Sequence, residues 1–262
     1  MERMMKKFLI VIVVVVLLIA GGAWYFLSGA GKIIAAQIEE QGSKFLGTSV
    51  TVLAVDVAFT QGRMTISGLD VANPEGFSKS KALSLKSIGL DLGDVLNEPY
   101  TVQTVTLNAP QVLYEVDAKG QGNLIVLKNS LMTNLPKAEP SPEPGGANPL
   151  VIVENVTISN VRLKLDFEKL PIGDLNIETK AYEITLPTFS AGAIGKPNGI
   201  PADQVGAAIA SAMLDNIISQ AKAEVKKRLE EEAKRKLKDK VDEEKEKLLE
   251  KAGDKLKGLF GG

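Results

Sequence analysis

The 262-residue chain contains no histidine and no cysteine, and only 5% of its residues are aromatic. Without histidine it lacks the usual general base near neutral pH and the commonest metal ligand. Without cysteine it has no thiol nucleophile, no disulfide and no thiolate metal site. Its 31 basic residues nearly balance 32 acidic ones, which argues against a general nucleic-acid-binding protein. These absences favour a structural, binding or transport protein over an enzyme.

Motifs of common enzyme classes are missing as well. The sequence has no glycine-rich nucleotide fingerprint, no phosphate-binding loop and no nucleophile elbow. Glu115 and Asp117 project to one side of an expected strand, but no further ligands are near them in sequence, so a metal site is not expected there. The sequence therefore predicts no catalytic residue, no metal and no cofactor.

The longest apolar run covers residues 8–27 and carries no charged side chain. At 1.5 Å per residue, about 20 residues span a hydrocarbon core of about 30 Å, and such a segment must be helical to satisfy its backbone. Arg3, Lys6 and Lys7 precede it, so the positive-inside rule puts the N-terminus in the cytoplasm and the remainder outside.

A cleaved signal peptide is the alternative, because the small residues 28–30 resemble a cleavage site. Signal-peptide apolar regions run about 7–15 residues, and this longer run favours a retained anchor. The expected segments are a cytoplasmic tail at 1–7, a transmembrane helix at 8–27, a juxtamembrane helix at 28–47, a first β region at 48–135, a Pro-rich linker at 136–149, a second β region at 150–192 and a C-terminal helix at 201–258.

From residue 48 the apolar residues alternate with polar ones, which is typical of half-buried strands. Short turns between the runs favour an antiparallel meander. The alternation slips by one residue between Val52 and Val55, and again between Leu85 and Ile88. Either a bulge absorbs each slip in a twisted, curved sheet, or each slip separates two short strands. After these strands, residues 190–201 are glycine-rich and read as a turn.

The C-terminal helix has two parts. Up to Ala221 its apolar residues recur at a spacing of three and four, which predicts a face that packs on the sheet. Beyond Ala221 it is mostly charged, with both signs interleaved and apolar residues every four positions. Three interpretations remain open for this part: a solvated single helix, a coiled coil or partner-binding helix, and a helix lying on the sheet or the membrane.

The sheet as a whole has one broad apolar face, which must be covered by a helix, by another sheet or by an apolar ligand. If its cover is incomplete, the face offers a groove for acyl chains that needs no catalytic residue. The side chains expected to face lipid are Val55, Val57, Leu90, Leu107, Leu163 and Ile184.

Several motifs follow the apolar run in a characteristic order. They are Gly62-x-Met64-x-Ile66-x-Gly68-Leu69-x-Val71-x-Asn73-Pro74-x-Gly76-Phe77, Leu83-x-Leu85-x-x-Ile88-x-Leu90-x-Leu92, Val105-x-Leu107-x-x-Pro110-x-Val112-x-Tyr114-Glu115, and Gly122-Asn123-Leu124 with Leu127. Together with the anchor they resemble the AsmA-like family of bacterial envelope proteins over residues 1–131. In that family the last motif belongs to the strand that ends the N-terminal module.

The resemblance implies an inner-membrane protein with its bulk in the periplasm, and its larger members look like lipid carriers with a long hydrophobic β-groove. This chain is short and ends in a charged helix instead. The expected fold is α+β: one N-terminal transmembrane helix, an antiparallel, curved and twisted β-sheet, and a long charged C-terminal helix. The leading hypothesis is a periplasmic protein that binds or passes phospholipid acyl chains and maintains the envelope. The alternative is a structural or adaptor protein whose charged helix binds a protein partner.

Overall fold

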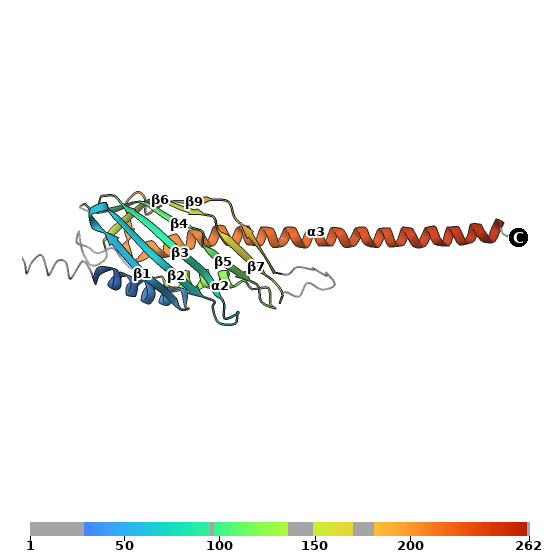
Figure 1. Ribbon diagram of the computed structural model, residues 1–262, viewed down its shortest axis with the longest axis horizontal. Coiled ribbons are helices and arrows are strands. Elements are labelled where there is room, and N and C mark those ends of the chain that lie inside the picture. Colours follow the sequence, from blue (N-terminus) through green and yellow to red (C-terminus); the bar gives the residue numbers. More distant parts are fainter. Residues whose placement is uncertain (1–28, 95–96, 136–148, 170–180, 261–262) are drawn as a thin grey trace, which may run out of the picture.

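The computed structural model describes residues 29–94, 97–135, 149–169 and 181–260. They form a mixed α+β fold in which helices cover one sheet (Figure 1). The helices are residues 29–46, α2 (Asn123–Asn134) and α3 (Ala202–Phe260), with a short turn of 3₁₀ helix at Phe59–Gln61. The predicted anchor at 8–27 lies outside the described residues, as does most of the predicted linker.

The described residues contain a 10-stranded sheet. Its strands are β1 (Val50–Ala58), β2 (Arg63–Ala72), β3 (Lys81–Leu92), β4 (Tyr100–Asn108), β5 (Gln111–Glu115), β6 (Leu150–Ser159), β7 (Arg162–Asp166), β8 (Ala181–Thr185), β9 (Phe189–Ile194) and β10 (Ile200–Pro201).

Three pairs of these strands continue one another. On one edge of β3, Ser87 pairs with Asn108 of β4 and Ser84 pairs with Gln111 of β5, so the register runs on across the short break between them. Strands β6 and β7 line up in the same way beside β4 and β5, and β8 and β9 line up beside β7 and β6. The sheet therefore has six rows, in the order β1, β2, β3, β4–β5, β6–β7 and β8–β9, with β10 beside the start of β6.

The predicted antiparallel meander is wrong at the centre of the sheet. Strand β4 pairs with β6 in parallel, and β5 pairs with β7 in parallel. Parallel neighbours need a crossover connection, which usually contains a helix. Here α2 lies in that connection.

The family motif at Gly122–Leu127 suggested a strand, and this expectation is also wrong. The residues form the start of α2, in which Leu124, Leu127 and Leu131 are buried at helical spacing. The prediction of a turn at residues 190–201 is wrong as well. These residues contain most of β9 and all of β10, and both strands pair with β6.

An aligned line of irregular positions crosses all six rows of the described sheet. In β1 and β2, Leu53 and Gly68 face each other but are not paired. The pairs on either side of them, Val52 with Leu69 and Ala54 with Ser67, are regular. Three of the positions have a positive φ, namely Gly68 at 63°, Ala109 at 52° and Asn160 at 54°. We call this line the crease; its positions are Leu53, Gly68, Lys86, Ala109, Asn160 and Pro187.

The crease keeps the apolar side chains on one face. In β4 the buried residues Val105 and Leu107 are odd-numbered, whereas Val112 and Tyr114 of β5 are even-numbered, yet all four belong to one core cluster. A regular strand without a crease would turn the second pair to the opposite face. The slips of alternation in β1 and β3 lie on the same line, and β1, β2 and β3 are all continuous there. In the other three rows, the slip divides two collinear strands.

Directly paired apolar residues run across the sheet and pack on the helices. One such row is Val50, Val71, Leu83, Val112, Leu163 and Ile184. Against this face lie Leu124 and Leu127 of α2 and Met213 and Ile217 of α3, all nearly inaccessible to solvent. Burying each such side chain stabilises the fold by about 1.5–3 kcal/mol.

The helix of residues 29–46 seals the edge strand β1. The backbone N–H of Val50 donates to Ser43 Oγ at 2.9 Å, and that of Val52 donates to Glu39 Oε1 at 2.7 Å. Phe45, in the last turn of this helix, packs with Leu131 and other residues of α2 and α3. Two N–H groups at the start of the outer edge of β1 are thus bonded to side chains of the helix, which covers that part of the edge against pairing with another strand.

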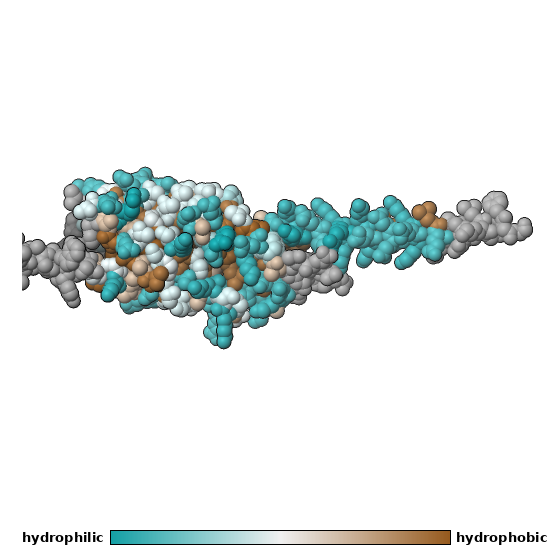
Figure 2. Space-filling view, viewed as in Figure 1, coloured by the Kyte–Doolittle hydropathy of each residue, from teal (hydrophilic) through white to brown (hydrophobic). Residues whose placement is uncertain are grey.

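The predicted C-terminal helix is confirmed as α3, whose 59 residues correspond to about 88 Å of helix. Its sheet-packing part reaches Val225, and the guanidinium of Arg228 lies 4.2 Å from the centre of the Tyr182 ring. From Leu229 onward, which we call the arm, the helix extends beyond the sheet, away from the end where helix 29–46 begins (Figure 1). Up to Glu250 the surface of the arm is mostly hydrophilic, with a small apolar spot near the end of that stretch (Figure 2). Within the described ranges, no helix has the length and hydropathy needed to cross a bilayer.

Gly68→Ala tests the crease. An added Cβ would lie 2.7 Å from Leu53 Cβ, and the positive φ of 63° disfavours any side chain. We expect a loss of roughly 1–3 kcal/mol in the free energy of unfolding, measured by urea titration. Gly89→Ala in β3 is the control, because its Cβ would meet nothing within 4 Å. Equal effects of the two changes would show that the crease imposes no special backbone requirement.

Candidate functional site

The six residues predicted to face lipid share the helix-covered face of the sheet. In-register neighbours lie on one face, and Val55 is linked to Leu107 through Ile66 and Ile88 by direct pairing. Val57 is linked to Leu90 through Met64 in the same way, and Leu163 pairs with Ile184.

These residues are not equally accessible. Leu163 is fully buried, Leu107 is 2% exposed and Val55 is 8% exposed. Val57, Leu90 and Ile184 are half-buried. Leu107 and Leu163 belong to the core that the helices cover, so the six side chains do not line one shared open groove.

Little space remains between the sheet and its helices. The apolar cavity there has a volume of about 30 Å³ and is lined by residues that include Val71, Leu83, Leu124, Met213 and Ile217. That volume corresponds to about one water molecule. An acyl chain would therefore have to displace α2 or α3 to reach this face.

A larger groove lies between the sheet edge at β8 and helix α3. Its volume is about 440 Å³, and it is a shallow groove that is largely open to solvent. Of the six predicted residues, Ile184 alone lines it. The lining residues are Ile184, Thr185, Leu186, Pro187, Gln220, Ala223, Glu224 and Lys227. This groove mixes an apolar strand edge with a polar and charged helix face.

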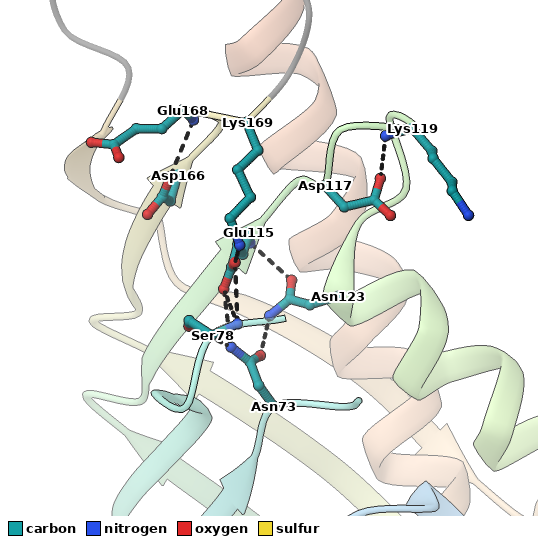
Figure 3. Close-up of polar contacts among 9 residues, drawn as sticks. All are labelled: Asn73, Ser78, Glu115, Asp117, Lys119, Asn123, Asp166, Glu168 and Lys169. Carbon is teal, nitrogen blue, oxygen red and sulfur yellow. Dashed lines mark hydrogen bonds and ion pairs between the residues drawn. The ribbon is translucent and has the colours of Figure 1, made fainter. Parts of the chain in front are cut away.

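A buried polar network joins the ends of β2, β5 and β7 (Figure 3). At its centre, the carboxylate of Glu115 is 4% exposed. It accepts hydrogen bonds from the backbone N–H of Ser78 at 3.1 Å and from Asn73 Nδ2 at 3.2 Å. Lys169 Nζ forms an ion pair with it at 3.0 Å. Every partner of the carboxylate is a donor, so its negative charge is well satisfied.

Asn123 completes this network from the start of α2 and is fully buried. Its Oδ1 accepts the backbone N–H groups of Glu115 at 2.9 Å and Leu124 at 2.8 Å. Its Nδ2 donates to Asn73 Oδ1 at 2.7 Å and to the carbonyl of Leu113 at 2.8 Å. All of its hydrogen-bonding capacity is used, so the side chain locks the crossover helix to the sheet.

The charge of Glu115 is stabilised in the folded state. Burial raises the pKa of its carboxyl, but the hydrogen bonds from Ser78 and Lys169 and the positive charge of Lys169 outweigh that effect and lower the pKa overall. The carboxylate in turn raises the pKa of Lys169. Because Glu115 is buried and fully engaged, the network is suited to holding loops together and offers a substrate no access.

Glu115 and Asp117 do not act as a pair, although they were expected to project to one side. Asp117 instead accepts the backbone N–H groups of Lys119 and Gln121 at 2.8 Å and shapes a turn. Across the described segments, no three His, Cys, Asp or Glu residues gather as a metal site. Sequence reasoning missed the network, although Asn73, Glu115 and Asn123 all lie in the family-like motifs.

No protein-family model, curated protein or solved structure matches this chain. The resemblance to the AsmA-like family therefore rests on the motifs themselves.

Glu115→Gln tests the network. We expect a loss of about 1–3 kcal/mol at neutral pH, because a buried charged hydrogen bond is replaced by a neutral one. A lowered folded-state pKa contributes stability that is present above the ordinary glutamate pKa of about 4.3 and is lost as the pH falls through the folded value. The variant should therefore lose less stability than the wild type on acidification below about pH 4.3, in urea titrations at several pH values. Glu168→Gln, on the exposed turn nearby, is the control and should follow the wild-type profile.

Leu163→Ala tests whether the apolar face is core. A fully buried leucine truncated to alanine should lose about 2–5 kcal/mol of stability. Leu53→Ala, which removes the same atoms from a side chain that is 83% exposed, should change stability by less than about 0.5 kcal/mol. If thermal or urea unfolding gives the two variants similar stabilities, Leu163 is not in a closed core.

Proposed function

We propose that this chain is a non-enzymatic adaptor, anchored in the bacterial inner membrane by residues 8–27, that presents the α3 arm to a protein partner in the periplasm. The observation that carries the proposal is that the first part of α3 packs on the sheet whereas its later part is exposed to solvent. Up to Arg228 the helix is fixed on the sheet, residues 229–236 are in part half-buried, and every residue from Leu237 to Glu250 is exposed. The folded domain thus serves as a rigid mount for the arm.

The mount gives the arm a set direction. Ala207, Met213, Ile217 and Ala221 of α3 are all buried, and Lys128 of α2 forms an ion pair with Asp215 of α3. The arm, residues 229–260, continues the same helix for about 48 Å. Because helix 29–46 begins at the opposite end of the fold (Figure 1), a preceding anchor would leave the arm pointing away from the membrane.

Lipid handling is the second candidate, and the groove between β8 and α3 is the observation that favours it. Its volume of about 440 Å³ is sufficient for part of a lipid, whereas the core cavity is not. In this version the acyl chain lies at the sheet edge beside Ile184, and the fully buried Leu107 and Leu163 have no contact with it.

Truncation after Lys236 tests the adaptor proposal. Because residues 237–250 are all exposed, we expect the truncated chain to unfold within about 1 kcal/mol of the full chain. In cells, a photo-crosslinking amino acid at Leu248 of the full chain should give a discrete protein adduct. The same amino acid at Thr185, in the groove, is the positional control and should not. Protein adducts at neither position, with lipid adducts at Thr185, would favour lipid handling instead.

A further inference from the structure

The arm carries an apolar seam of its own. Leu237, Val241 and Leu248 are 66%, 49% and 66% exposed, and their spacing of four and seven puts them on one helix face. At 3.6 residues per turn, Val241 lies about 160° around the axis from Val225, which packs on the sheet core. The seam is therefore not a continuation of the face that covers the sheet.

A heptad description fits this seam. Val241 and Leu248 then occupy a positions, and Leu237 and Glu244 occupy d positions. In a coiled coil the flanking e and g residues set the choice of partner. All four of these flanking positions are lysine: Lys238, Lys240, Lys245 and Lys247.

Between Leu237 and Glu250 the charges are segregated around the helix, although they alternate along the sequence. Within the described part of the chain, none of the four flanking lysines forms an ion pair. The remaining acidic residues between Leu237 and Glu250 fall on b, c and f positions, away from the seam. They are Asp239, Asp242, Glu243, Glu246 and Glu250.

This arrangement disfavours two occupants. In a pair of identical arms, e and g lysines would face one another, and like charges at these positions oppose association. A membrane surface is a poor fit because helices that lie in it bury a broad face rich in Trp, Phe and Leu. The three seam residues make a narrow stripe, with Leu249 outside it at a b position, and a narrow stripe suits a helix.

We propose that the arm docks a helix of another protein that has an apolar seam and acidic residues at its e and g positions. This inference rests on the adaptor function and names the partner's chemistry. The four lysines would pair with the partner's carboxylates, and Glu244 in the seam would face a basic or polar side chain. Apolar burial gives the contact, and the lysines select an acidic partner over a second copy of this chain.

Binding of two synthetic helical peptides to the detergent-solubilised full chain tests the proposal. Both peptides have apolar a and d positions apart from one Lys placed opposite Glu244; one has Glu at every e and g position and the other has Lys. Fluorescence anisotropy should show saturable binding of the acidic peptide, weakening as salt is added, and no binding of the basic one. Equal binding of both, or binding of neither, overturns the proposal.

Matched variants locate the contact. Lys238→Glu with Lys240→Glu reverses two flanking charges and should weaken binding of the acidic peptide about tenfold. Arg235→Glu with Lys236→Glu reverses two charges at b and c positions nearby and should weaken it far less. All four positions are on an exposed or half-exposed stretch of helix. Arg235 pairs with Glu232 at 2.9 Å, so the control variant should be the less stable of the two in unfolding measurements, and a greater loss of affinity in the lysine variant is not an effect of unfolding. Equal losses of affinity would mean that the attraction is general and not directed to the seam.

The remaining outcomes are also decisive. Displacement of the acidic peptide by phosphatidylglycerol vesicles, but not by phosphatidylcholine vesicles, would assign the face to a membrane and overturn the proposal. Self-association that Val241→Ser abolishes, seen by analytical ultracentrifugation, would assign it to a second copy. Crosslinks at Leu248 in cells without binding of the acidic peptide would leave the adaptor function standing and overturn this partner chemistry alone.

Discussion

The fold depends on one requirement: the apolar side chains of a six-row sheet must all face the same covering layer. Val105 and Leu107 precede the crease and Val112 and Tyr114 follow it, with opposite sequence parity, yet they share one core. The crease meets that requirement by interrupting every row at an aligned position. Ala109 adopts a positive φ there, a strained conformation for alanine that the surrounding sheet must hold in place. The helices then cover a single continuous face.

The polar interactions serve the same arrangement. Asn123 and Glu115 tie the first turn of α2 to the ends of β2, β5 and β7, where a parallel crossover must leave and rejoin the sheet. Glu39 and Ser43 accept the N–H groups of Val52 and Val50 at the edge of β1. With the face covered and that edge occupied, the conspicuous exposed apolar surface of α3 is on its arm.

Local patterns predicted part of this structure. The alternation from Val50 onward fixes the strands, and the spacing of Val205 to Ile217 fixes the packed part of α3, because both are short-range periodicities. The slips at Val52 and Leu85 marked the crease in two rows. Its alignment across the sheet depends on which strands pair, a long-range property that no single strand contains. The prediction of an antiparallel meander was wrong for the same reason: strand pairing is a long-range property, and the connection through α2 places β6 beside β4 in parallel. The hydrogen-bond network of Asn73, Glu115 and Asn123 could not be predicted from local patterns either, because these residues are distant from one another in sequence.

The proposed function builds on the closed face: because the core has no room for an acyl chain, we propose the exposed arm as the working surface. The most direct test is native mass spectrometry with lipid extraction on residues 29–262, which keep the helix that seals β1 and omit the apolar run at 8–27. A folded protein at its apo mass, without co-purified phospholipid, is the result that the adaptor account predicts. Phospholipid retained at a defined stoichiometry would contradict that account and would show that the sheet or its β8 edge is a lipid site.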